Sequence, residues 1–442
     1  MGSGASGNGR FVLPYGSGEM TFTLPADWQV REVPFRPYPK VAQPEGAVQE
    51  ALAHPIVSPP LREVVKPGEK VCILVNDSTR KARTELFLPL VLDELNRGGV
   101  ADADVFLVFA TGSHRRVTPD EMEALAGPRV AGRVAMYSHD CHDDAMLIFL
   151  GHTSRRTPVF INTRVVQADR RILTGSVVFH WFAGFGGGRK VMVPGVAGYE
   201  TIRRNHALLL APGARIGVLD GNPVHEDLLE ATRMVGADFL LNTVLEPDGD
   251  LLGVFAGELE AAHRAACDLA RQAFGVYAGP EKADVVIASC GGWPKDIDVY
   301  QAHKALENAA AICRQGGVLV LVAECREGIG SEKYWEWVEK YGSLAELERA
   351  IRERFELGGH KAWAVARLTS GWRVILLSSL PREVAQRLGF LPAGSPAEAM
   401  ALAEDMLTQA SRAGGTAADR PKVNAVIMPQ AALTVPLASA CL

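Results

Sequence analysis

The sequence has few of the features that would place it in a common class at sight. Its 442 residues contain no apolar run of the eighteen or so residues that a membrane-spanning helix needs. The formal net charge is −5 and no segment gathers Lys and Arg into a stripe, so nothing suggests a nucleic-acid partner. The opening segment, MGSGASGNGR, lacks the hydrophobic stretch of a secretory signal, and a cytoplasmic location without membrane attachment is therefore expected.

Cysteine is scarce and scattered. The seven cysteines are odd in number and no two of them form a C-x-x-C pair, so neither a disulfide framework nor a cysteine zinc site is expected. They stand at Cys72, Cys141, Cys267, Cys290, Cys313, Cys325 and Cys441.

The common nucleotide-binding motifs are also absent, although residues 175–206 form a glycine-rich, basic stretch. A Walker loop needs glycine before its lysine and Ser or Thr after it, whereas Arg189 precedes Lys190 and Val191 follows. The glycines also lack the spacing of the dinucleotide fingerprint. Such a loop lets backbone approach a bound group closely and offers N–H donors to an anion.

The order of elements along the chain predicts an α/β fold. Apolar runs at 71–75, 104–109 and 171–174 alternate with polar loops and with helices, which are expected over 84–96 and from Pro119 onward. Strand, polar loop and helix in repetition are typical of a doubly wound, mostly parallel sheet.

The length favours two or three domains. We expect an N-terminal α/β domain over residues 11–275, rejoined by 421–442, and a C-terminal α/β domain over 283–413. Within the first, residues 11–66 are rich in proline and predict edge strands and an extended arm rather than helix.

Chemically useful side chains follow three of the predicted strands. Ligands in such sheets bind at the carboxyl ends of the strands, so these residues are expected to meet at one rim. They are Asp77, Thr79 and Arg80 after the first strand, His114 after the second, and His180 and Lys190 after the third.

These residue types indicate a metal- or cofactor-assisted enzyme acting on a small anionic substrate. His114 and His180 can exchange protons near neutral pH, and His206 can bind a metal through neutral imidazole. Lys190 can bind a cofactor covalently, and Arg80 can hold a carboxylate, as can Lys304 on a predicted helix near residue 301.

Two other functions fit the same residues. One is a zinc or other metal hydrolase with His114, His180 and His206 as ligands, although no compact metal motif such as H-E-x-x-H is present. The other is a non-catalytic cofactor-binding homologue. His139 and His142 could form a second ligand cluster, but a strand-end loop is the favoured interpretation.

One known family combines these motifs. The segments DSTR at 77–80, TGSHR at 111–115, GFGGGRK at 184–190 and YQAHK at 300–304, with His180 and His206, resemble the nickel-pincer lactate racemase family. The resemblance covers nearly the whole chain. It implies two α/β domains with doubly wound, mostly parallel sheets and an active-site cleft between them.

The resemblance also implies a function. It predicts a racemase or epimerase of a small 2-hydroxy acid that works by reversible hydride transfer through a 2-oxo acid. The implied cofactor is the nickel-pincer nucleotide (nickel pyridinium-3-thioamide-5-thiocarboxylic acid mononucleotide), which separate biosynthetic proteins supply.

Individual roles carry over to matching positions. Lys190 would be the covalent anchor, His206 the nickel ligand, and His114 and His180 the paired acid/base groups. The implied cofactor contacts are Asp77, Thr79, Gly187 and Gly188. The implied substrate contacts are Arg80, Tyr300, Gln301, Lys304 and Trp363.

Overall fold

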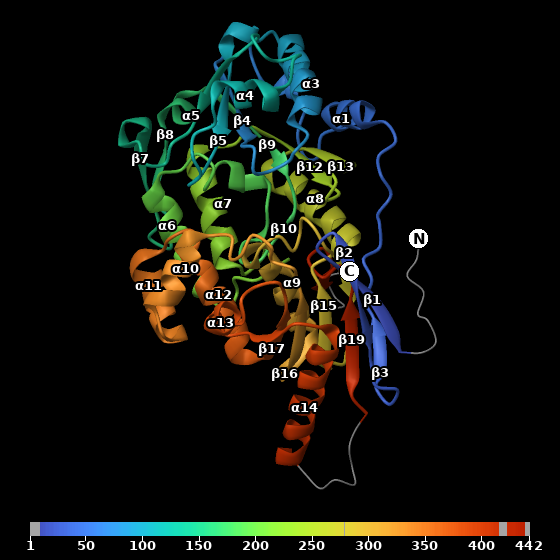
Figure 1. The fold of residues 1–442 in the computed structure, drawn as a ribbon. Coiled ribbons are helices and arrows are strands. Elements are labelled where there is room, and N and C mark those ends of the chain that lie inside the picture. The colour runs from blue at the N-terminus through green and yellow to red at the C-terminus, as the bar shows by residue number, and fades with distance from the viewer. Residues whose placement is uncertain (1–8, 278, 415–421, 438–442) are drawn as a thin grey trace. The chain divides into compact units, whose positions relative to one another are not determined.

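The computed structural model describes residues 9–277, 279–414 and 422–437. The chain divides into two compact units, whose elements are labelled in Figure 1. The central unit comprises residues 38–273, and the terminal unit combines the chain up to residue 37 with the chain from residue 274 onward.

The central unit is built on a six-stranded sheet of order β13-β12-β9-β4-β5-β6. Only the β12–β13 pair is antiparallel, so the prediction of a mostly parallel α/β sheet is confirmed for this unit. Its strands are β4 (Val71–Asn76), β5 (Val105–Ala110), β6 (Ala135–Ser138), β7 (Leu147–His152), β8 (Pro158–Asn162), β9 (Arg170–Ser176), β10 (Phe179–His180), β11 (Gly184–Phe185), β12 (Phe239–Leu245) and β13 (Leu251–Gly257). Its helices are α1 (Pro44–Ala53), α2 (Leu61–Val64), α3 (Thr84–Arg97), α4 (Pro119–Ala126), α5 (Thr163–Gln167), α6 (Tyr199–Ala207), α7 (Pro223–Val235) and α8 (Leu259–Phe274).

Strand β4 shows why the apolar runs form the middle of this sheet. All five residues from Val71 to Val75 are buried, so neither face of the strand meets solvent. A continuous apolar run of this kind is typical of a parallel strand covered on both faces.

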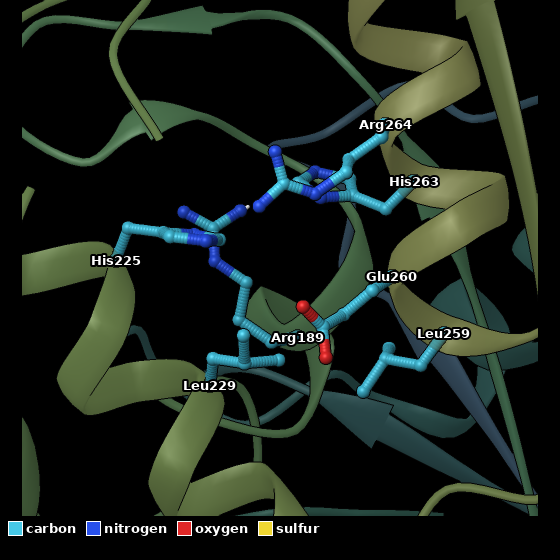
Figure 2. A pocket seen from close by; sticks show the side chains of 7 residues that line it. All are labelled: Arg189, His225, Leu229, Leu259, Glu260, His263 and Arg264. Carbon is cyan, nitrogen blue, oxygen red and sulfur yellow. Dashed lines mark hydrogen bonds between the residues drawn. The ribbon is translucent and has the colours of Figure 1, made fainter. Parts of the chain in front are cut away.

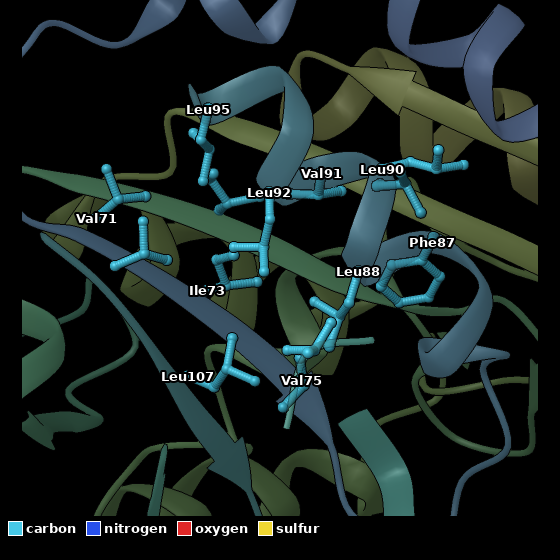
Figure 3. Packing of buried hydrophobic residues seen from close by; sticks show 14 of the residues in the cluster. Val71, Ile73, Val75, Phe87, Leu88, Leu90, Val91, Leu92, Leu95 and Leu107 are labelled. Atoms are coloured by element: carbon cyan, nitrogen blue, oxygen red, sulfur yellow. The ribbon is translucent and has the colours of Figure 1, made fainter. Parts of the chain in front are cut away.

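Helix α3 covers one of those faces (Figure 3). Its buried residues Phe87, Leu88 and Val91 pack in one cluster with Ile73 of β4 and Leu107 of β5. The spacing of these positions gives the helix one apolar face, and burial of that face holds α3 on the sheet.

The terminal unit has a second six-stranded sheet, of order β18-β17-β16-β15-β19-β3, in which every neighbouring pair is parallel. Its strands are β1 (Arg10–Tyr15), β2 (Gly18–Thr23), β3 (Gln29–Glu32), β14 (Gly275–Tyr277), β15 (Ala283–Ser289), β16 (Cys313–Val322), β17 (Arg373–Leu377), β18 (Leu391–Ala393), β19 (Asn424–Met428) and β20 (Val435–Leu437). Its helices are α9 (Val299–Ile312), α10 (Glu332–Lys340), α11 (Leu344–Arg354), α12 (Gly359–Gly371), α13 (Arg382–Arg387) and α14 (Pro396–Gly414).

The sheet pairing corrects the predicted domain boundaries. Strand β19, near the end of the chain, pairs with β15 rather than with a strand of the central unit, and β3 then pairs with β19. Strands β3 and β19 therefore belong to the same sheet as the C-terminal strands β15 to β18. The first domain begins near residue 38, not 11, and the described part of the closing segment 421–442 does not rejoin it.

The prediction of an extended arm up to residue 66 was wrong for residues 44–53, which form α1. Proline was counted there as a helix breaker, but Pro44 occupies the start of the helix, where its missing N–H costs nothing. No helix within the described ranges is long and apolar enough to cross a membrane.

The core of the central unit predicts a stability difference between two isoleucines. Ile73 is fully buried in β4, whereas Ile148 of β7 is 39% exposed. Ile73→Ala should lower the free energy of unfolding by about 2–5 kcal/mol through lost burial and a residual cavity. Ile148→Ala should cost about 1 kcal/mol or less. Urea unfolding of both variants measures the difference, and equal losses would contradict this description of the core.

Candidate active site

Three neighbouring strands of the central sheet bring the predicted residues together. Strands β9, β4 and β5 are adjacent and parallel, and Asn76 at the end of β4 lies opposite Ala110 at the end of β5. Asp77 and Thr111 therefore leave the sheet side by side. The expectation that these three strand ends share one rim is confirmed.

A carboxylate–imidazole contact joins two of these ends. Asp77 is 4% exposed, and its Oδ2 lies 2.6 Å from Nδ1 of His114. Its Oδ1 accepts from the hydroxyl and the backbone N–H of Thr79, at 2.6 and 3.1 Å. Because an ionised carboxylate can only accept, His114 donates from Nδ1 and directs Nε2 away from Asp77.

Electrostatics favour this arrangement. Burial by itself raises the pKa of Asp77, but hydrogen bonds from His114 and Thr79 and the charges of His114 and Arg80 outweigh it and lower the pKa. Asp77 is thus an ionised, buried partner for His114. Sequence reasoning placed Asp77 and Thr79 beside the cofactor and missed this orienting contact with His114.

Phe182 lies at the centre of the remaining predicted residues. The ring centroid of His180 lies 4.5 Å from that of Phe182, and the His206 centroid lies 5.2 Å from it. Nζ of Lys190 lies 5.9 Å from the same ring centroid. Sequence reasoning did not select Phe182, although it stands two residues after His180 and is 3% exposed.

Arg80 links these residues electrostatically to the end of β4. After burial, the positive charge of Lys190 and then that of Arg80 hold the pKa of His180 well below its usual value. Burial, followed by the charges of Arg80 and Arg189, likewise holds the pKa of Lys190 far below that of a free amine. His180 also accepts a hydrogen bond at Nδ1 from the backbone N–H of Ala183, at 3.2 Å. His180 is therefore a neutral imidazole with its proton on Nε2.

His206 has a similar environment. It lies on α6, is 8% exposed, and has its pKa lowered to about 3 by burial and by the charges of Lys190 and Arg80. A neutral imidazole is the form that binds a metal ion.

The glycines before Lys190 allow the loop to pack closely against neighbouring side chains. A Cβ on Gly188 would lie 2.6 Å from the His263 ring, and one on Gly187 would lie 2.8 Å from Oδ1 of Asn242. Both glycines have positive φ, of 68° and 54° for Gly187 and Gly188, which side chains other than glycine rarely adopt. The Gly188 N–H donates to Asn242 Oδ1 at 2.8 Å, so this donor is already used within the protein.

Arg189 is directed into the interior (Figure 2). Its side chain is 1% exposed and extends between His225 of α7 and His263 of α8. Arg189 Nη1 lies 3.3 Å from His263 Nε2, and Nη2 donates to the carbonyl of Ala183 at 2.8 Å. These contacts of Arg189 hold the glycine-rich loop in the interior. The neighbouring side chain, Lys190, lies near the Phe182 ring instead. The segment GGGRK gave no sign of His263 or Asn242, which are distant in sequence.

The other predicted substrate contacts lie in the terminal unit. Asp298 caps α9 by accepting from the backbone N–H of Gln301 at 2.7 Å, and Lys304 Nζ donates to the Gln301 side chain at 2.9 Å. On α12, Trp363 is 7% exposed and its indole N–H donates to Glu348 at 3.3 Å. Tyr300 lies in the first turn of the same helix as Gln301. It is linked to α12 through Lys361, whose Nζ lies 4.8 Å from the Tyr300 ring centroid.

The structure does not support a second ligand cluster at His139 and His142. His139 is fully buried, with Nε2 3.0 Å from the carbonyl of Ala197 and Nδ1 3.2 Å from Asn162. Over the described ranges, no three His, Cys, Asp or Glu side chains are grouped to hold a metal ion. A hydrolase site ligated by His114, His180 and His206 therefore has no support in this geometry.

Comparison with known proteins identifies the family. Residues 15–217 match the lactate racemase N-terminal domain, and residues 279–414 match the lactate racemase C-terminal domain. A lactate racemase of Thermoanaerobacterium thermosaccharolyticum is 31% identical over 90% of this chain and 95% of its own length. The chain belongs to the lactate racemase family.

Other relatives agree with this assignment. A lactate racemase of Lactiplantibacillus plantarum is 34% identical over 69% of this chain and 70% of its own length. The structure of the T. thermosaccharolyticum lactate racemase apoprotein matches with a TM-score of 0.83 at 28% identity, covering 97% of this chain and all of that one. This lactate racemase family member is therefore an enzyme, an isomerase of the racemase type, with the two-domain α/β fold of its relatives.

The contact between Asp77 and His114 predicts that a substitution at Asp77 lowers activity without lowering stability. Asp77→Asn keeps the shape but removes the charge that orients His114 and stabilises its protonated form. Racemase kcat should fall by about 10²–10⁴-fold with little change in KM or in the unfolding midpoint. Asp93→Asn, at a side chain that is 46% exposed, is the matched control. Steady-state kinetics with equal activity in both variants would exclude an orienting role for Asp77.

Proposed function

We propose that this enzyme racemises lactate or a similar small 2-hydroxy acid. The observation that carries the proposal is the pair of histidines in one unit of the fold. His114 is oriented by a carboxylate at 2.6 Å, and His180 is held neutral among positive charges beside Lys190. Interconversion of mirror-image hydroxy acids needs one group to take the hydroxyl proton and a second to return it, so that either can act in either direction.

The residues around Phe182 fit the nickel-pincer nucleotide. The lowered pKa of Lys190 favours the neutral, nucleophilic form of its amine, which covalent attachment requires. His206 would offer a neutral imidazole to nickel, and its ring centroid lies 5.2 Å from that of Phe182. Arg80, exposed at the end of β4, supplies positive charge for the anionic groups of the nucleotide or of the substrate.

The predicted contacts of Asp77, Thr79, Gly187 and Gly188 with the cofactor belong to this proposal. The two glycines would act by letting the loop fold tightly against Asn242 and His263, which places Lys190. Asp77 and Thr79 would act through His114.

Hydride chemistry suits this substrate class. The α-hydrogen of a hydroxy acid is a weak acid beside a carboxylate, and its removal as a proton would create a dianion. When bound, the nickel-pincer nucleotide supplies a carbon that can take the α-hydrogen as hydride and give it back. The substrate then needs to lose only its hydroxyl proton to become a neutral carbonyl group.

The protein's own side chains perform the proton steps. To accept the hydroxyl proton of one enantiomer, His180 would exchange the Ala183 N–H at Nδ1 for the substrate hydroxyl. Loss of that proton and of the α-hydrogen as hydride leaves a 2-oxo acid. After the 2-oxo acid turns, His114 protonates the opposite enantiomer, while Asp77 stabilises its imidazolium form. The reverse reaction exchanges the two roles.

The proposed substrate contacts are side chains that can bind a carboxylate. Arg80 can grip a carboxylate with two parallel hydrogen bonds, and Lys304 can add a point charge. Gln301 lies 2.9 Å from Lys304 through its amide oxygen, so the two are positioned together. Tyr300 and Trp363 are proposed as further substrate contacts. Cofactor supply by separate biosynthetic proteins and a cytoplasmic location complete the proposal.

Attachment at Lys190 is directly measurable. Protein co-expressed with a pincer-cofactor pathway should show an intact mass increased by one nickel-pincer nucleotide and should racemise lactate. Lys190→Ala should lose both the adduct and the activity, because no other amine lies on that loop. Lys66→Ala, at an exposed lysine of the same unit, should keep both.

Two results would redirect the proposal. Activity supported by bound metal with no added mass at Lys190 would indicate the metal hydrolase. An adduct on the native chain with no racemisation of any 2-hydroxy acid would indicate a non-catalytic homologue.

A further inference from the structure

Lys361 of α12 is a buried lysine to which the proposed function assigns no role. It is 3% exposed, and its Nζ lies 3.0 Å from His303 Nδ1 on α9. The same Nζ lies 4.8 Å from the centroid of the Tyr300 ring. A buried ammonium is costly unless other groups stabilise it, so these two contacts call for an explanation.

Beyond Lys361 the contacts continue as a chain. His303 is 1% exposed, and its Nε2 lies 3.1 Å from Glu307 Oε1. That oxygen accepts from Arg367 Nη2 at 2.5 Å, and the Arg367 guanidinium carbon lies 5.6 Å from the Trp363 ring centroid. The chain therefore joins two predicted substrate contacts, Tyr300 at one end and Trp363 at the other.

The direction of the hydrogen bonds follows from the charges. Burial raises the pKa of Glu307, but the hydrogen bond from His303 and the charges of His303 and Arg367 lower it to about 2. Burial and the charge of Lys361 lower the pKa of His303 to about 4, so its imidazole is neutral. A neutral imidazole carries one N–H, which faces the Glu307 carboxylate, and Nδ1 is left to accept from Lys361.

We propose that Lys361 is a positioning residue for the substrate carboxylate. His303 holds the Lys361 ammonium against the Tyr300 ring, where it fixes the ring and adds a second positive charge to that of Lys304. This inference rests on the proposed function, because it needs Tyr300 and Lys304 to face the substrate. It adds a residue that acts through another side chain rather than by touching the substrate.

The charge on Lys361 is poised to respond to an anion. Burial, and after it the charge of Lys304, lower the pKa of Lys361 to about 7, while Glu307 and Asp298 act in the opposite direction. The charged groups that act on Lys361 are Lys304 and Glu307 of α9 and the cap Asp298, and His303 of α9 contacts it directly. The neighbouring helices α10 and α11 and α12 itself carry further charged side chains, among them Lys333, Glu348, His360 and Arg367.

The sign of the pH dependence follows. Below about pH 7 Lys361 is charged and favours an anion beside Lys304, and above it this charge is lost. A bound carboxylate must in turn raise the pKa of Lys361. KM for lactate should therefore rise as pH rises through neutrality, by about tenfold for each pKa unit that the bound carboxylate adds.

The test measures KM and kcat for lactate with holoenzyme between pH 5.5 and 9. Lys361→Met should raise KM at low pH to the wild-type value at high pH and abolish the rise. Lys361→Arg, which keeps its charge, should hold KM low throughout. Lys340→Met is the matched control, since Lys340 Nζ lies 5.2 Å from the Tyr341 ring but on the exposed side of α10.

His303→Gln gives a second, gentler variant. Glutamine can still accept from Lys361 and donate to Glu307 but cannot titrate, so the rise in KM near pH 7 should persist. If Lys361→Met does not fold, competitive acylation of the lysines in wild-type holoenzyme replaces it. The titration midpoint of Lys361 should then move to higher pH when lactate is added.

Failure of this inference can be distinguished from failure of the proposed function. Wild-type holoenzyme that racemises lactate with a KM independent of pH, or a Lys361→Met profile equal to wild type, would overturn this inference alone. An unmoved Lys361 midpoint with bound lactate would do the same. Wild-type holoenzyme without any racemase activity would overturn the proposed function and the inference that rests on it.

Discussion

The backbone pairing of β9, β4 and β5 in one parallel sheet is the constraint on which the candidate site depends. Parallel neighbours end at the same edge, so the loop after β4 must run beside the loop after β5. Asp77 and His114 meet because of this register. The contact gives a buried carboxylate a hydrogen-bond donor and fixes the orientation of the His114 imidazole.

The two proposed acid/base groups differ in their surroundings. His114 faces an ionised carboxylate, whereas His180 accepts a backbone N–H and lies among the charges of Lys190 and Arg80. His180 is therefore a neutral imidazole, whereas His114 has a carboxylate beside it that can accept from its ring N–H. The two faces of a racemase pocket therefore need not be chemically equivalent, provided that each histidine can reach both protonation states during turnover.

Much of the fold could be predicted from the sequence, because its signals are local. The apolar run at 71–75, the capping box at Thr118 and the helix after Arg83 form as expected. The domain boundary could not be predicted, since β3 and β19 are short strands whose partners are chosen by long-range pairing. Helix α1 was missed because proline at a first helical position resembles proline in a loop.

For the site, the sequence predicted which strand ends lie at one edge of the sheet but not what the side chains there contact. His114, His180 and Lys190 follow neighbouring strands whose carboxyl ends lie at one edge of the sheet. The role of Asp77 toward His114, the ring of Phe182, and the packing of Gly188 on His263 depend on side-chain geometry across distant segments. The contacts that link Lys361, His303 and Glu307 could not be predicted for the same reason, because in the sequence these residues look like ordinary helix residues.

The central claim is that a cofactor carries the α-hydrogen as hydride while His114 and His180 exchange only the hydroxyl proton. The most direct measurement is racemisation of α-deuterated lactate by holoenzyme in ordinary water, with the label in the product enantiomer followed by mass spectrometry. The account predicts that the product keeps its deuterium, since hydride does not exchange with solvent. Replacement of the label by solvent hydrogen at the rate of racemisation would contradict it and assign proton abstraction at carbon to the histidines.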